Sequence, residues 1–115
     1  MSLLSIRKVI ISIIGEPREI SQNQREFFSN YTHPNGNFIA ESENINSRIY
    51  SRVVILGERR PYDIQVQVLI ETKSNGTFET TGIDKQRTKG LVNELNLKLN
   101  QSRINGNNID EFRAF

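Results

Sequence analysis

Cysteine and tryptophan are absent from the 115-residue sequence, and histidine occurs once, at His33. Without cysteine the chain can form neither disulfides nor thiolate metal sites. A single histidine excludes a metal site built from several imidazoles, and it leaves one residue for any Ser-His-Asp arrangement. His33 lies in a Pro/Gly turn without an obvious partner in the sequence around it, so we interpret it as a surface residue.

The sequence also lacks the other common signatures of catalysis. Its seven glycines are isolated from one another, so no glycine-rich phosphate loop is present. The carboxylates of Asp63, Glu71, Glu79 and Asp84 are scattered, and no two of them form an acid–base pair at a useful spacing. The sequence therefore predicts a protein that is not an enzyme, with no catalytic residue, no metal site and no cofactor.

Apolar runs long enough to cross a membrane are missing. The run from Val9 to Ile14 is too short for a bilayer. Arg7 and Lys8 interrupt the apolar stretch and no small-residue cleavage site follows, so it is a poor signal peptide. We therefore expect no transmembrane segment. The location stays open between the cytoplasm and the periplasm or cell envelope, the latter if a signal was trimmed from an exported protein.

The stretch from Tyr62 to Leu91 carries the clearest structural pattern. Apolar and polar residues alternate from Tyr62 to Glu71, which is typical of a strand with one buried face. Asn75-Gly76 is the strongest hairpin-turn signal in the chain, and Thr77 to Gly82 is the return strand, with Phe78 as its apolar anchor. An amphipathic helix capped by Asp84 then runs to about Arg103.

Local sequence patterns also predict the elements of the first half of the chain. β-branched residues favour a strand over Ser5 to Ile14. A helix is expected from about Pro17 or Ser21 to Tyr31, because Pro suits a first helical turn and Ser21-Gln-Asn-Gln24 resembles a capping box. The polar stretch from Thr32 to Ser47 is an irregular loop, either functional or mobile, in which Phe38-Ile39-Ala40 forms a short edge strand. Arg48 to Leu56 reads as a strand that is apolar on both faces.

These elements predict an α+β fold with a mainly antiparallel four-stranded sheet and two helices on one face. The order is β-α-β-β-β-α plus a C-terminal tail, with a single domain over residues 1–106 and the tail over 107–115. Core residues are expected to include Ile64, Val66, Val68, Phe78, Leu91, Leu95 and Leu99. In the tail, Ile109, Phe112 and Phe115 recur at helical spacing, and we interpret them as candidate contacts with a protein partner.

A basic cluster is the second candidate site. Arg59 and Arg60 lie between two strands, and Lys85, Arg87 and Lys89 lie in the first turns of the last helix. Cations are unfavourable at a helix N-terminus, so their presence there is typical either of an anion site or of a solvated surface. The net charge of +2 permits an anionic partner without requiring one.

Two resemblances follow from these patterns. The order helix, three strands, helix, with basic residues from Gly82 to Lys89, resembles double-stranded RNA-binding domains, in which lysines at the start of the last helix contact phosphates. Leu91, Val92 and Asn93 stand where that family has small residues. The order strand, helix, three strands, helix is similar to small outer-membrane assembly lipoproteins, which act as partners rather than catalysts.

The function expected from the sequence is a non-enzymatic protein-binding or assembly module, of the kind found as a soluble part of a bacterial envelope lipoprotein. The alternative is an RNA- or polyanion-binding domain that uses the basic start of the last helix. The identity of the protein partner and the oligomeric state are left open by the sequence.

Overall fold

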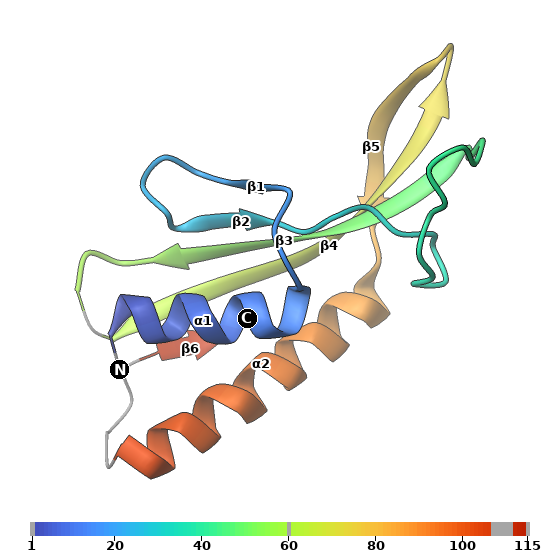
Figure 1. The fold of residues 1–115 in the computed structure, drawn as a ribbon. Coiled ribbons are helices and arrows are strands. Elements are labelled where there is room, and N and C mark those ends of the chain that lie inside the picture. Colours follow the sequence, from blue (N-terminus) through green and yellow to red (C-terminus); the bar gives the residue numbers. More distant parts are fainter. Residues whose placement is uncertain (1, 60, 107–111, 115) are drawn as a thin grey trace.

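The computed structural model describes residues 2–59, 61–106 and 112–114, and for residues 101–106 and 112–114 it describes the backbone alone. The elements in chain order are α1 (Leu3–Ile14), β1 (Glu19–Ile20), β2 (Glu26–Phe28), β3 (Ser47–Leu56), β4 (Tyr62–Ser74), β5 (Thr77–Ile83), α2 (Lys85–Gly106) and β6 (Phe112–Ala114). This is an α+β fold, as predicted, with both helices on the same side of the sheet (Figure 1).

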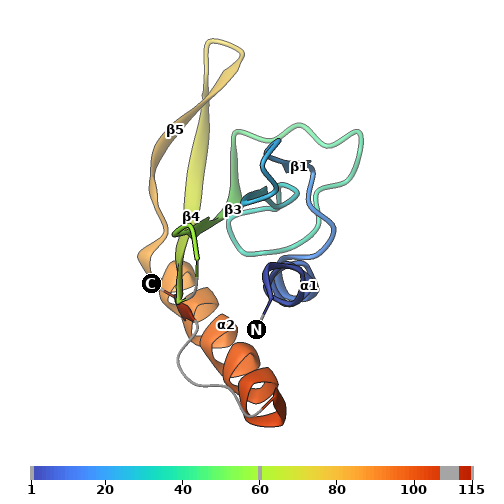
Figure 2. The same cartoon turned by 90° about the vertical axis from the view of Figure 1, so that its left-hand side faces the viewer.

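The sheet has six strands rather than the predicted four. Strands β1 to β5 are antiparallel neighbours in sequence order, and β6 pairs in parallel with the first residues of β4. The two longest strands, β3 and β4, are in register from Ser47 opposite Thr72 to Leu56 opposite Asp63. The far end of β4 and β5 project beyond the helices as a hairpin (Figure 2).

The first element is a helix, so the predicted strand over Ser5 to Ile14 is wrong. Ser2 caps the helix by accepting a hydrogen bond from the Ser5 N–H at 3.1 Å, and Gly15 ends it with a φ of 82°. Ile6 and Ile10, one turn apart, are fully buried. Burial of one helical face outweighs the small intrinsic preference of isoleucine for strands.

The predicted helix ending at Tyr31 is also wrong, because this segment forms the β1–β2 hairpin. Ser21, interpreted as a helix cap, instead closes the turn. Its N–H donates to the Glu26 carbonyl at 2.9 Å, and its hydroxyl accepts from the Glu26 N–H at 2.9 Å. Gln24 has a φ of 59°, which suits a turn and not a helix.

The loop between β2 and β3 contains one further difference. The expected edge strand at Phe38-Ile39-Ala40 is reduced to a single bridge between Thr32 and Phe38. Gly36, with a φ of 89°, makes the tight turn in which its N–H donates to the His33 carbonyl at 2.7 Å.

The second half of the chain agrees with the sequence pattern. Asn75 and Gly76 both have positive φ, as expected for a two-residue hairpin turn. Asp84 caps α2, because its Oδ1 accepts a hydrogen bond from the Arg87 N–H at 3.0 Å.

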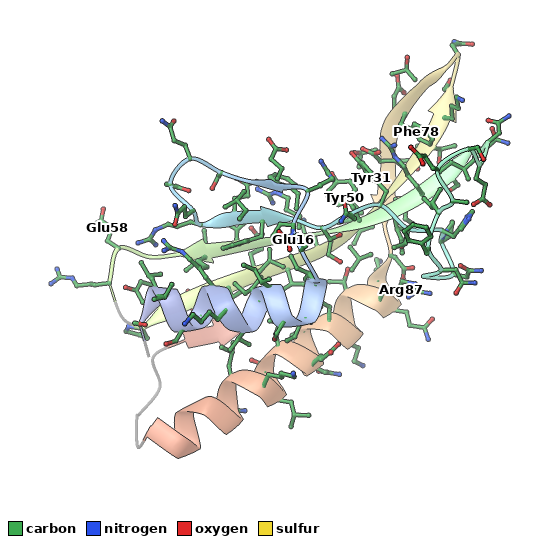
Figure 3. All side chains as sticks on the ribbon, viewed as in Figure 1. Glu16, Tyr31, Tyr50, Glu58, Phe78 and Arg87 are labelled. Carbon is green, nitrogen blue, oxygen red and sulfur yellow. The ribbon has the colours of Figure 1, made fainter. Side chains whose placement is uncertain are left out.

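One core packs between the helices and the sheet. It contains Ile6 and Ile10 from α1, Leu95 and Leu99 from α2, and the sheet residues Phe27, Val53, Ile55, Tyr62, Ile64 and Val66. Phe78, predicted to be a core residue, lies on the opposite face of the sheet, where no helix covers it (Figure 3).

Candidate functional site

The face of the sheet opposite the helices is open, and its polar and aromatic side chains come from alternate strand positions. Along β3 these are Arg48, Tyr50 and Arg52, which pair with Glu71, Leu69 and Gln67 of β4. All six residues are half-buried, so neighbouring side chains on the same face partly cover them.

Arg48 is at the centre of this face. Its guanidinium carbon lies 3.6 Å from the ring centroid of Tyr31 and 3.8 Å from that of Phe78, so it is stacked between two aromatic rings. Its Nε donates to Glu71 Oε1 at 2.7 Å. The ion pair is well covered, with side-chain exposures of 22% for Arg48 and 14% for Glu71.

Arg18 inserts among the rings from the segment after α1. Its guanidinium carbon lies 4.3 Å from the ring centroid of Tyr31, 4.8 Å from that of Tyr50 and 5.4 Å from that of Phe28. Tyr31 meets Tyr50 edge to face, with 5.6 Å between centroids. We call the set Arg18, Phe28, Tyr31, Arg48, Tyr50 and Phe78 the arginine–aromatic cluster.

Chain segments far apart in sequence therefore meet on one surface, and Figure 3 shows Tyr31, Tyr50 and Phe78 on the side away from α1 and α2. Two arginines on this face pair with carboxylates. Besides the Arg48–Glu71 pair, Arg52 Nε donates to Glu26 Oε1 at 2.6 Å. The surface is thus rich in aromatic rings, and the charges of Arg48 and Arg52 are balanced by neighbouring carboxylates.

The predicted basic cluster is divided between two distant parts of the molecule. Arg59 lies in the turn between β3 and β4, next to Glu58, whereas Arg87 lies at the start of α2 (Figure 3). The turn precedes Tyr62, and α2 begins beside Leu69, which pairs with Ile83. Seven strand residues separate these points by about 23 Å at ~3.3 Å per residue. Arg60 lies outside the described residues.

At the start of α2 the three basic residues differ in their surroundings. Arg87 Nε donates to the Pro34 carbonyl at 3.1 Å and lies 3.6 Å from Asp84 Oδ2, so it links the helix to the turn at Gly36. Lys85 and Lys89 are exposed, and within the described part of the chain they form no ion pair. Among the described residues, these two lysines are therefore without an ionic partner.

The tail residues are described only in part. Phe112 is the first residue of β6. The backbone of β6 pairs Phe112 with Tyr62 and Ala114 with Ile64, so this part of the tail is a strand, although its apolar residues recur at helical spacing. Ile109 and Phe115 lie outside the described residues.

His33, the single histidine, pairs with Glu43 in the loop between β2 and β3. The Ala40 N–H, 3.0 Å from Glu43 Oε2, and the His33 Nε2 atom, 2.8 Å from Oε1, hold the pKa of the Glu43 carboxyl below its ordinary value of 4.5. Within residues 2–59, 61–106 and 112–114, no group of three or more His, Asp or Glu residues is placed to hold a metal ion.

Part of the arginine–aromatic cluster was predictable from the sequence, although the charge and motif patterns considered above did not indicate it. Arg48, Tyr50 and Arg52 are two residues apart in a strand, so they must share a face. Tyr31 and Arg18 could not be added from sequence, because they reach this face only through the β1–β2 hairpin.

Comparisons of the chain with known protein families, with curated proteins and with solved structures found no match. None of the described helices is long and apolar enough to cross a membrane.

Proposed function

We propose that this protein is a non-enzymatic binding or assembly module whose partner is another protein, and that the partner contacts the open face of the sheet. The observation that carries the proposal is the arginine–aromatic cluster, because Tyr and Arg are the residues most enriched at the energetic centres of protein interfaces. Its rings and guanidinium groups stack on one another, so these side chains are already restricted in conformation. They would therefore lose little conformational entropy when a partner binds.

The charges on this face support a protein partner over a polyanion. Arg48 and Arg52 each already pair with a carboxylate, and a phosphate would have to displace Glu71 or Glu26. A protein surface can instead supply apolar contacts to the rings together with matched charges around them. Phe78 belongs to β5, which is the last strand in the sheet order β1 to β5. The outer edge of β5 offers backbone groups to which a partner strand can be added.

The experiment is affinity capture from a lysate of the source cells with two variants. Tyr50→Ser removes a ring at the centre of the cluster, and Leu97→Ser is the matched control, because Leu97 is 61% exposed on α2, in the helix layer. We expect Tyr50→Ser to lose the captured protein and Leu97→Ser to keep it, with circular dichroism confirming that both variants fold. Equal capture by both variants contradicts the proposal.

The polyanion-binding alternative rests on Lys85 and Lys89, which are exposed at the start of α2. Two phosphate contacts would give a shallow salt dependence, with a log–log slope of about −2 on a duplex. Lys85→Glu with Lys89→Glu tests this directly in a titration with double-stranded RNA at about 50 mM salt. Binding that the double variant abolishes would favour the alternative, and we expect no binding by the wild type.

A further inference from the structure

A cavity of about 590 Å³ lies on the helix side of the sheet, beyond the end of the core. Its floor is formed by Ile49 and Ser51 of β3 and Val68 of β4, and its walls include Ile14 of α1 and Leu91 of α2. This volume is within the range of pockets that hold small organic ligands. The floor residues lie on the opposite face of the sheet from the arginine–aromatic cluster, and Tyr50 of that cluster is also among the residues that line the cavity.

The apolar side chains that the cavity leaves accessible come from the two helices. Ile49 and Val68 at its floor are only 5% and 4% exposed, and the start of α2 covers Val68, whose N–H donates to the Thr88 hydroxyl at 2.9 Å. Ile13 and Ile14 of α1 and Leu91 of α2 also line the cavity and are half-buried. Their accessible parts provide a surface for an apolar ligand.

Ser51 is a polar residue on this otherwise apolar floor. Alternation along β3 places it on the helix side with Ile49 and Val53. Its backbone bonds with Ser29, but its hydroxyl makes no hydrogen bond within the described part of the chain. A hydroxyl that stands half-buried without a partner is available to a ligand.

Two charged side chains line the cavity, and they differ in whether they are already neutralised. Arg87 lies 3.6 Å from Asp84 and donates to the Pro34 carbonyl. Glu94, two helical turns further along α2, is exposed and forms no ion pair with any described residue. Glu94 is therefore the lining charge that is available to pair with a cationic group of a ligand.

We propose that this cavity binds a small molecule with an apolar ring or chain and one protonated amine. The apolar part contacts Ile13, Ile14 and Leu91, the amine pairs with Glu94 at the rim, and the Ser51 hydroxyl bonds to any polar group on the buried part of the ligand.

The probes are three molecules of one shape and different charge: 1-naphthylmethylamine, 1-naphthalenemethanol and 1-naphthoate. Titrations are followed by the chemical shifts of the Ser51 and Leu91 amides. We expect the amine to bind about two- to fivefold more tightly than the alcohol, the range for one exposed ion pair, and the anion to bind most weakly. Absence of binding by all three, or tightest binding by the anion, overturns the proposal.

Two pairs of variants locate the site. Ser51→Phe fills the cavity from its floor and should weaken binding of the amine at least tenfold, whereas Ser74→Phe makes the same change at an exposed position of β4 and should leave binding unchanged. Glu94→Gln should make the amine and the alcohol equal, and Glu79→Gln, at an exposed position of β5, should preserve their difference. Equal effects within either pair contradict the assignment, and thermal unfolding of each variant verifies that it folds.

Discussion

Arg48 is stacked on Tyr31, with its guanidinium carbon 3.6 Å from the ring centroid, and at the same time donates to Glu71. The pairing links β3 and β4 to the segment after β2 without any contribution from the core. It also fixes the Tyr31 ring on the uncovered face of the sheet. This pair therefore connects the stability of the domain with the surface that we propose for partner binding.

Replacing Arg48 by lysine should lower the free energy of unfolding by about 1–2 kcal/mol, because an ammonium group cannot stack flat on both Tyr31 and Phe78. Urea denaturation measures the change. Arg52→Lys is the matched control, since Arg52 pairs with Glu26 but stacks on no ring among the described residues. Equal losses in the two variants would show that stacking contributes nothing.

Val66→Asp should abolish the cooperative unfolding transition, because an unpaired charge in the core costs several kcal/mol. Gln65→Asp is its control on the adjacent residue, whose side chain points to the open face, and it should unfold near the wild-type temperature. A cooperative transition of Val66→Asp at that temperature would contradict the position of the core.

Deletion of residues 107–115 should leave the domain folded but less stable. The truncated chain loses β6 and its parallel pairing with Tyr62 to Ile64, and each lost hydrogen bond contributes about 0.5–1.5 kcal/mol. Circular dichroism and urea denaturation measure fold and stability. Affinity capture with the same variant tests the tail as a contact, and unchanged capture would remove Ile109, Phe112 and Phe115 from the interface.

The His33–Glu43 pair predicts a defined pH response of the loop between β2 and β3. The pKa of Glu43 is lower in the folded state than when unfolded, so its contribution to stability is present above the unfolded-state pKa and is lost as the pH falls through the folded-state pKa. His33→Ala should move the Glu43 titration midpoint up toward 4.5, followed by NMR of the carboxyl carbon. Asn44→Ala, at an exposed neighbour, should leave it unchanged.

The part of the fold that was predictable from sequence is the part governed by local rules. The alternation in β4, the Asn75-Gly76 turn and the Asp84 cap each specify structure over a few residues, and all three are present. The predicted type of element was wrong where tertiary packing, rather than the local sequence, determines whether a segment forms a helix or a strand. α1 is rich in isoleucine, and the burial of Ile6 and Ile10 in the core favours a helix there.

The candidate site was less accessible from sequence. The basic cluster predicted from the sequence included Arg59 and the basic residues from Lys85 to Lys89, which the structure places far apart. The arginine–aromatic cluster depends on the β1–β2 hairpin, which brings Arg18 and Tyr31 to the face that carries Arg48. No local pattern specifies that juxtaposition, because the segments involved are joined only by strand pairing.

Site-specific photo-crosslinking tests the open face as the binding surface most directly. A photoreactive phenylalanine at Thr80, which is exposed and pairs with Glu71 on the open face, should form a covalent adduct with the partner protein in the source cells. The same group at Lys98, exposed on α2, should form none. Adducts from Lys98 with none from Thr80 would place the partner on the helix layer and contradict the account.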